Sequence, residues 1–184
     1  MPEKETKKLK LLLEDGSVFE GESFGAYRET EGEVVFATAM VGYPESLTDP
    51  SYNGQILTLT YPLVGNYGVP PHTPGKEIEE VFESKKIWPR GLIVSEYSKD
   101  FSHWEATRSL ADWLKEHDIP AITGIDTRAL TKKIREHGVM LGKIVFAETE
   151  TDDKFHDPNE VALIPETSVT VPVHFPAGKK PIAM

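Results

Sequence analysis

The side chains best suited to acid–base or metal chemistry are few, and their spacing assembles no familiar centre. The six histidines lie at positions 72, 103, 117, 137, 156 and 174. None stands in the HxH, HxxxH or HExxH spacing typical of metal ligands, so the sequence predicts no metal site. His117 and His137 fall near the ends of predicted helices, where a partial positive charge complements the helix dipole.

Ser102 and His103, with Asp100 nearby, suggest a hydrolase as one hypothesis. A serine nucleophile and its base usually come from distant positions and meet in space. Ser102 also opens a Ser-His-Trp-Glu capping box, which is typical of the start of a helix. We therefore favour a helix cap and predict no catalytic residue in this chain.

The sequence contains no cysteine. The chain itself therefore has no disulfide, no thiolate metal ligand and no cysteine nucleophile.

Two glycine-containing segments could contact a ligand. Residues 65–68 (GNYG) lack the GxxxxGK[ST] spacing of a phosphate loop and open no evident helix, which favours a tight turn. Residues 42–52 (GYPESLTDPSY) contain two Xaa-Pro units, which would hold several hydroxyls at fixed positions. That pattern fits either a ligand contact or simple turn formation.

Residues 126–133 (DTRALTKK) combine a helix start with three cations. They are either the solvated side of an amphipathic helix or a basic patch for an acidic partner. Both interpretations remain open at this point.

The chain begins with strand patterns and continues with strands alternating with helices. A hairpin is predicted around Glu14-Asp15-Gly16, because Asp-Gly between apolar runs favours a tight β-turn. A strand over 55–61 is predicted to be half-exposed, since apolar residues alternate with threonine. The remaining expected strands span 33–41, 91–97, 121–125 and 140–146, and the expected helices span 77–84, 102–118 and 126–138.

This order predicts an α+β fold with a mixed sheet, or two packed sheets, and helices on one side. We expect a disordered amino terminus over residues 1–8 and a domain over 9–149. Prolines recur at 158, 165, 172 and 176, so residues 150–180 are expected to form an extended linker.

Charge and hydropathy restrict the possible partners. The formal net charge is −10, which disfavours nucleic acid and anionic membranes. The polar amino terminus lacks the apolar stretch of a signal peptide, and no run is long enough to cross a membrane. The expected location is the cytoplasm.

Eight motifs occur in order along the chain: LEDG (13–16), GEVVF (32–36), MVGY (40–43), LTDPSY (47–52), LTYP (59–62), GNYG (65–68), SHW (102–104) and GIDTRALT (124–131). Together, over residues 9–147, they resemble the amino-terminal domain of the small, glutamine-hydrolysing subunit of carbamoyl phosphate synthetase. The details of residues 65–68 and 102–104 are most similar to the fused multifunctional pyrimidine-synthesis enzymes of eukaryotes, which combine the synthetase with aspartate transcarbamylase and dihydroorotase.

The resemblance implies a swivelling β/β/α domain followed by a class I glutamine amidotransferase (glutaminase) domain. In that family a cysteine attacks glutamine, and the ammonia passes to a synthetase that uses ATP and magnesium. Because this chain has no cysteine, we expect a non-catalytic docking domain that needs no cofactor of its own. Residues 181–184 resemble the start of the missing amidotransferase domain.

The resemblance also assigns Ser51 to the glutamine site of the neighbouring domain. A hydroxyl on a loop stiffened by Pro50 could bind the substrate at modest entropic cost. The expected partners are the glutaminase domain, the synthetase large subunit or domain, and glutamine in the assembled enzyme. A free-standing regulatory or binding protein that kept this fold is the alternative.

Overall fold

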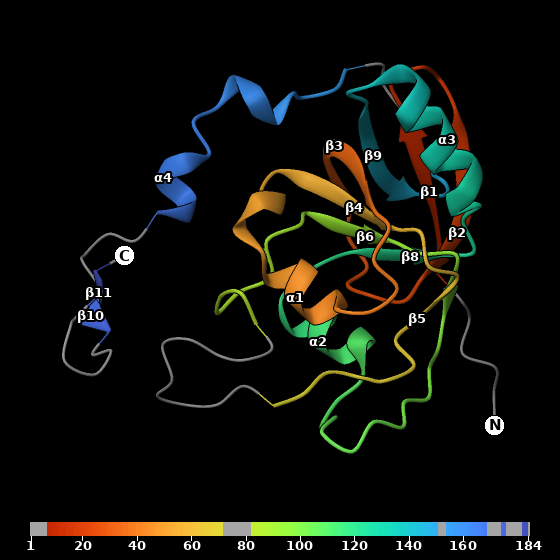
Figure 1. The fold of residues 1–184 in the computed structure, drawn as a ribbon. Coiled ribbons are helices and arrows are strands. Elements are labelled where there is room, and N and C mark those ends of the chain that lie inside the picture. The colour runs from red at the N-terminus through yellow and green to blue at the C-terminus, as the bar shows by residue number, and fades with distance from the viewer. Residues whose placement is uncertain (1–6, 72–81, 151–153, 169–173, 176–181, 184) are drawn as a thin grey trace.

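The computed structural model describes residues 7–71, 82–150, 154–168, 174–175 and 182–183. Its main feature is a closed β-barrel (Figure 1). The barrel strands are β1 (Lys8–Leu13), β2 (Val18–Ser23), β3 (Thr30–Ala37), β4 (Gln55–Leu59), β6 (Gly91–Ile93), β8 (Ala121–Thr123) and β9 (Leu141–Phe146). They are hydrogen-bonded in the order β1-β2-β8-β6-β4-β3-β9. A mixed α/β architecture is therefore confirmed, but its sheet is closed into a barrel.

The predicted hairpin joins β1 and β2, and Leu12 pairs with Val18 at its turn end. Gly16 adopts a φ of 83° there, which glycine accepts without steric cost. Asp15 forms an ion pair with Lys133 at 2.6 Å, and the lysine lowers the pKa of this carboxyl to about 2. The hairpin turn is thereby connected to a helix far along the sequence.

Alternate side chains of the strands point to opposite sides of the barrel wall, as strand geometry requires. Ile56, Ile93 and Ile122 belong to the inner cluster, together with leucines of β1. Their sequence neighbours Leu57 and Leu92 belong to an outer cluster beneath two helices. The wall of β4, β6 and β8 is thus covered by apolar groups on both sides.

The helices lie against different parts of the barrel. α1 (Tyr43–Thr48) and α2 (Leu110–Glu116) contribute Leu47 and Leu114 to the outer cluster. α3 (Thr127–His137) contributes Leu130 and Ile134 to the inner cluster. Figure 1 shows α3 well away from α1 and α2. The expectation of helices on one side is therefore wrong, because α1 and α2 pack on the outer cluster of the barrel and α3 packs on the inner cluster.

The third helix begins and ends as predicted. Asp126 is its N-cap, and its carboxylate accepts a hydrogen bond from the Ala129 amide at 2.9 Å. Gly138, at a φ of 94°, is its C-cap.

The second helix begins later than predicted. Ser109, and not Ser102, is its N-cap, and it accepts a hydrogen bond from the Asp112 amide at 3.1 Å. The backbone of Ser102 instead donates to the carbonyl of Asn66 at 3.2 Å. Residues 102–109 are therefore held by the loop beside them and remain outside the helix.

Two predicted strands also differ from the structure. The half-exposed strand is wrong, because β4 is buried over residues 56–59, and Thr58 is fully buried with them. The strand expected over 91–97 divides into β6 and β7 (Glu96–Tyr97), and β7 pairs with β5 (Leu63–Val64). Most of the helix expected over 77–84 lies outside the described residues, and residues 82–84 are not helical.

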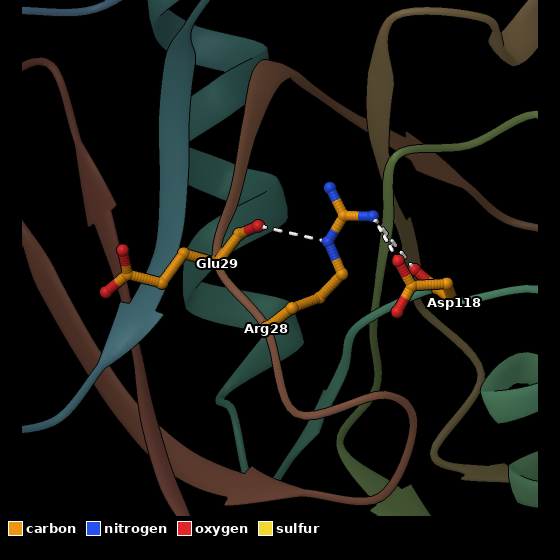
Figure 2. A network of polar contacts seen from close by, with 3 residues as sticks. All are labelled: Arg28, Glu29 and Asp118. Atoms are coloured by element: carbon orange, nitrogen blue, oxygen red, sulfur yellow. Dashed lines mark hydrogen bonds and ion pairs between the residues drawn. The ribbon is translucent and has the colours of Figure 1, made fainter.

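The connection from β2 to β3 is joined to the loop between α2 and β8 by Arg28, as Figure 2 shows. The Arg28 guanidinium donates to the carboxylate of Asp118 at 2.7 Å and to its carbonyl at 3.3 Å. Asp118 is also the one non-glycine residue with a positive φ, 57°, among the residues that the structure describes. The ion pair is well exposed, so it contributes little to stability.

Two substitutions at position 118 separate the backbone effect from the ion pair. Asp118→Ala and Asp118→Gly both remove the carboxylate, but only glycine accepts the left-handed conformation freely. We expect the alanine variant to have a free energy of unfolding about 1 kcal/mol below that of the glycine variant. Urea denaturation measures both, and equal stabilities would show that the loop relaxes.

The described part of the tail contacts the domain at Asn53 and Gly54. It contains two short turns, η2 (Pro158–Glu160) and α4 (Ile164–Thr167), and two-residue strands β10 (His174–Phe175) and β11 (Ile182–Ala183). The amino-terminal residues 1–6 and several tail residues lie outside the described residues. Within the described ranges, every helix is too short or too polar to cross a bilayer.

Candidate functional site

Residues 42–52 fold into two consecutive helical turns. Gly42, at a φ of 86°, opens α1, and Pro44 occupies its first turn. Asp49 then caps η1 (Pro50–Tyr52), where its carboxylate accepts a hydrogen bond from the Ser51 amide at 2.8 Å. Pro50 at the start of η1 has a φ suited to the turn. The two prolines and the Asp49 cap, all adjacent in the sequence, thus hold the loop rigid.

The Ser51 hydroxyl is presented to the surface by this turn. Ser51 is exposed, and within the described part of the chain its hydroxyl has no hydrogen-bond partner. Its backbone is fixed by Asp49, so the hydroxyl is available to a ligand or to a neighbouring domain without a change of backbone.

Hydrogen bonds of two tyrosines join the start of α1 to the turn at residues 65–68. The Tyr67 hydroxyl accepts hydrogen bonds from the amides of Gly42 at 2.9 Å and Tyr43 at 3.1 Å. In return the Tyr43 hydroxyl donates to the carbonyl of Gly68 at 2.5 Å. The rings stack with centroids 4.2 Å apart. Gly42, the N-cap, has no side chain, and Tyr67 instead accepts from the amides of the N-cap and of the first helical residue.

Burial raises the pKa of both Tyr43 and Tyr67, so both hydroxyls stay protonated at neutral pH. The segment 65–68 is the predicted tight turn, closed by a hydrogen bond from the Gly68 amide to the Gly65 carbonyl at 3.0 Å. The sequence did not reveal that its tyrosine accepts hydrogen bonds from another element.

The other end of α1 is held by the loop before β6. The Thr48 hydroxyl donates to the Pro44 carbonyl at 2.8 Å and accepts from the Glu83 amide at 3.0 Å. The Ser84 hydroxyl donates to the Thr48 carbonyl at 2.7 Å. Both ends of α1 are therefore fixed by polar contacts from distant segments.

The tail passes directly beside η1. The Asn53 side chain donates to the Glu166 carboxylate at 3.1 Å. A side chain at Gly54 would come within 2.9 Å of Pro158 and 3.1 Å of Leu163. The chain that leaves the barrel is thus in contact with the residues that follow Ser51.

The hydrolase hypothesis has no support in the geometry. The His103 ring nitrogen Nδ1 accepts a hydrogen bond from the Glu105 amide at 3.3 Å, and both Ser102 and His103 are exposed. No hydrogen bond joins Ser102 to His103 or to Asp100 in the described residues. The structure therefore does not bring a serine and a base together here.

His117 is the C-cap residue of α2, near a helix end as predicted. Burial lowers the pKa of His117, and the nearby Arg108 lowers it further. The ring packs edge-on against Trp113 at 6.0 Å between centroids. Among the described residues, no three His, Cys, Asp or Glu side chains form a group able to hold a metal ion.

The basic residues of α3 are partly neutralised within the chain. Lys133 pairs with Asp15 at 2.6 Å, and Lys132 approaches Glu136 at 4.0 Å. Arg128 is exposed near the helix start. This favours the solvated side of an amphipathic helix over a dedicated basic patch.

Sequence comparisons with known proteins agree on one family. The sequence profile of the family "Carbamoyl-phosphate synthase small chain, CPSase domain" matches residues 11–144. The chain is 53% identical over 171 residues to multifunctional protein CAD of Squalus acanthias, covering 91% of this chain and 8% of that protein. It is 47% identical to the carbamoyl phosphate synthase arginine-specific small chain of Yarrowia lipolytica, covering 90% of this chain and 38% of that protein.

A third relative carries a different description. The mitochondrial carbamoyl-phosphate synthase [ammonia] of Homo sapiens is 51% identical, with 86% of this chain and 10% of that protein covered. The chain therefore spans a small part of each of these relatives. An aminopeptidase from Aneurinibacillus covers 78% of this chain and 31% of its own, at 15% identity and a TM-score of 0.41, which is too low to support a conclusion.

Proposed function

Because the chain belongs to the carbamoyl-phosphate synthase small-chain family, we propose that it is a non-catalytic docking domain of a glutamine-hydrolysing carbamoyl phosphate synthetase. In this role it braces a glutaminase domain and helps to join it to the ATP-dependent synthetase. The observation that carries the proposal is a family match over residues 11–144 in a chain without any cysteine. A thiolate is the nucleophile of that chemistry, so cleavage has to take place on another part of the enzyme.

The placement of Ser51 supports this role. Its hydroxyl is exposed and unpaired among the described residues, and the outgoing tail lies beside the same turn. A glutaminase domain connected through this tail would be able to approach the hydroxyl. Ser51 would then complete the glutamine site from outside, as the family resemblance implies.

A relative named for ammonia also supports a role other than cleavage. The human protein contains a segment 51% identical to this chain, although its name specifies ammonia and not glutamine. Retention of the domain in such a protein is expected if the domain serves assembly. It would be unexpected if glutamine cleavage were its only purpose.

Several finer points belong to the same proposal. The domain over residues 9–149 would be of the swivelling type, with residues 150–180 as a linker and 181–184 as the start of the glutaminase domain. The complete enzyme would use ATP and magnesium in its synthetase part, in the cytoplasm. The relatives named CAD and arginine-specific small chain make pyrimidine and arginine synthesis the two candidate pathways, and we favour pyrimidines.

Removal of the Ser51 hydroxyl tests the proposal in the complete enzyme. Loss of one hydrogen bond to the substrate costs about 1 kcal/mol, so Ser51→Ala should raise the KM for glutamine about fivefold. Synthesis from free ammonia should be unchanged, because ammonia bypasses the glutamine site. Steady-state assays with each nitrogen donor measure the two effects.

Ser102→Ala is the matched control, because Ser102 is also an exposed serine. It should leave both activities unchanged. An unaltered KM for glutamine in Ser51→Ala would remove Ser51 from the glutamine site.

A further inference from the structure

The described tail contacts two neighbouring strands of the barrel. The Lys143 ammonium of β9 lies over the Phe155 ring, 5.0 Å from the ring centroid. His156 Nδ1 lies 2.7 Å from the carboxylate of Glu31 on β3. Glu31 and Lys143 are paired across the two strands, with the carboxylate and Nζ 3.8 Å apart. The tail therefore meets both strands at one position, and we call its residues 155–166 the strap.

The strap next packs on the residue that leads into β4, the strand on the other side of β3. Pro158 is buried, and a side chain at Gly54 would come within 2.9 Å of its Cβ atom and 3.1 Å of Leu163. Gly54 also packs against β3, where a side chain at Gly32 would collide with the Gly54 carbonyl. Successive strap residues therefore follow β9, β3 and β4 in the order in which the sheet places them.

The residues under the strap form the exit of η1, the turn that carries Ser51. Asn53 is the C-cap of η1, and its amide donates to the Pro50 carbonyl at 3.1 Å. The Asn53 side chain donates to the Glu166 carboxylate of the strap at 3.1 Å. The strap therefore contacts the C-cap by a hydrogen bond and the following residue, Gly54, by packing.

The exit is the part of this turn that local chemistry constrains least. Asp49 holds the start of η1 through the Ser51 amide, but a three-residue turn has little stability of its own. Gly54, at a φ of 83°, belongs to the residue type with the most permissive backbone. Contacts from outside must therefore fix the direction in which the turn ends, and the strap supplies one hydrogen bond and two apolar contacts.

We infer that the strap positions the Ser51 hydroxyl by holding the exit of η1. Asn53, Gly54 and Glu166 are then positioning residues for the glutamine site, and they act without touching the substrate. This inference rests on the proposed function, which assigns Ser51 to that site.

Amide hydrogen exchange in the 184-residue chain tests the contact directly. The amides of Tyr52 and Asn53 donate to carbonyls at the start of the turn, so their exchange reports its opening. Leu163→Glu places a carboxylate in the apolar contact and should accelerate exchange of both amides by about fivefold or more. Ending the chain at residue 153 removes the whole strap and should have the same effect.

Val161→Glu is the matched control, because Val161 is a 56% exposed valine of the same strap. In this variant both amides should exchange within about twofold of the wild-type rate. Wild-type exchange rates in the chain that ends at residue 153 would overturn the inference, whether or not the proposed function holds.

Kinetics of the complete enzyme test the positioning role. Asn53→Asp replaces the hydrogen bond to Glu166 by two like charges, so the KM for glutamine should rise about threefold. Synthesis from free ammonia should be unchanged. Adding Glu166→Gln restores a donor opposite the new carboxylate and should return the KM to the wild-type value, a rescue that general destabilisation would not allow.

The Ser51→Ala variant separates the two levels of the account. A raised KM for glutamine in Ser51→Ala, together with a wild-type KM in Asn53→Asp, would overturn the inference and leave the proposed function standing. A wild-type KM in both variants would overturn the inference and also remove Ser51 from the glutamine site.

Discussion

Leu47→Ala should lower the free energy of unfolding by about 2–5 kcal/mol, the range for a buried leucine truncated in a packed core. Leu47 is fully buried between α1 and the outer wall of the barrel. Its carbonyl also accepts a hydrogen bond from the Trp88 amide at 3.0 Å, so the backbone around it cannot collapse freely. Urea denaturation of the variant and the wild type measures the loss.

The exposed Ile164 of α4 provides the control for this prediction. It is 77% exposed, so Ile164→Ala should change the free energy of unfolding by less than about 0.5 kcal/mol. A loss below about 1 kcal/mol in Leu47→Ala would mean that α1 is only loosely attached. The rigid presentation of Ser51 would then no longer follow from the fold.

Tyr67→Phe should lower the free energy of unfolding by about 1–3 kcal/mol, because it removes a partly buried acceptor. The amides of Gly42 and Tyr43 both donate to the Tyr67 hydroxyl. Without it these two amides have no acceptor, since Gly42 offers no side chain. Denaturation measures the loss, and hydrogen exchange should accelerate at these two amides specifically.

Tyr61→Phe is the matched control, because Tyr61 is 40% exposed and its hydroxyl makes no hydrogen bond to the described residues. It should alter the free energy of unfolding by less than about 0.5 kcal/mol. Equal effects of the two substitutions would show that Tyr67 contributes only its ring.

Local chemistry made much of the fold predictable. The Asp15-Gly16 hairpin and the helix between Asp126 and Gly138 have signals within a few residues, and both are confirmed. The closure of the barrel was not predictable in this way, because it depends on pairing β1 with β9 across most of the chain. The buried Thr58 follows from that closure, since a strand covered on both sides no longer needs a polar face.

The capping box at Ser102 shows how tertiary contacts override a local signal. Both Ser102 and Ser109 can cap a helix, and the pairing of Val69 with Arg108 fixes the intervening segment as a loop. Only the serine after that pairing is free to start α2.

The candidate site, too, has one part that local sequence predicts and one part that depends on tertiary contacts. Asp49, Pro50 and Ser51 are adjacent, so a stiff turn that presents a hydroxyl could be predicted from their order. The contact between Tyr67 and Gly42 joins two segments whose sequences show no sign of each other. The one available clue was that α1 begins with Gly42, which has no side chain of its own to cap the helix.

The most direct test is to incubate the purified 184-residue chain with glutamine and measure ammonia release. A polypeptide with no thiol can support a glutamine-cleaving centre but cannot supply its nucleophile. Ammonia should accumulate no faster than in a protein-free blank. Sustained release above that blank, in proportion to protein concentration, would contradict the docking role.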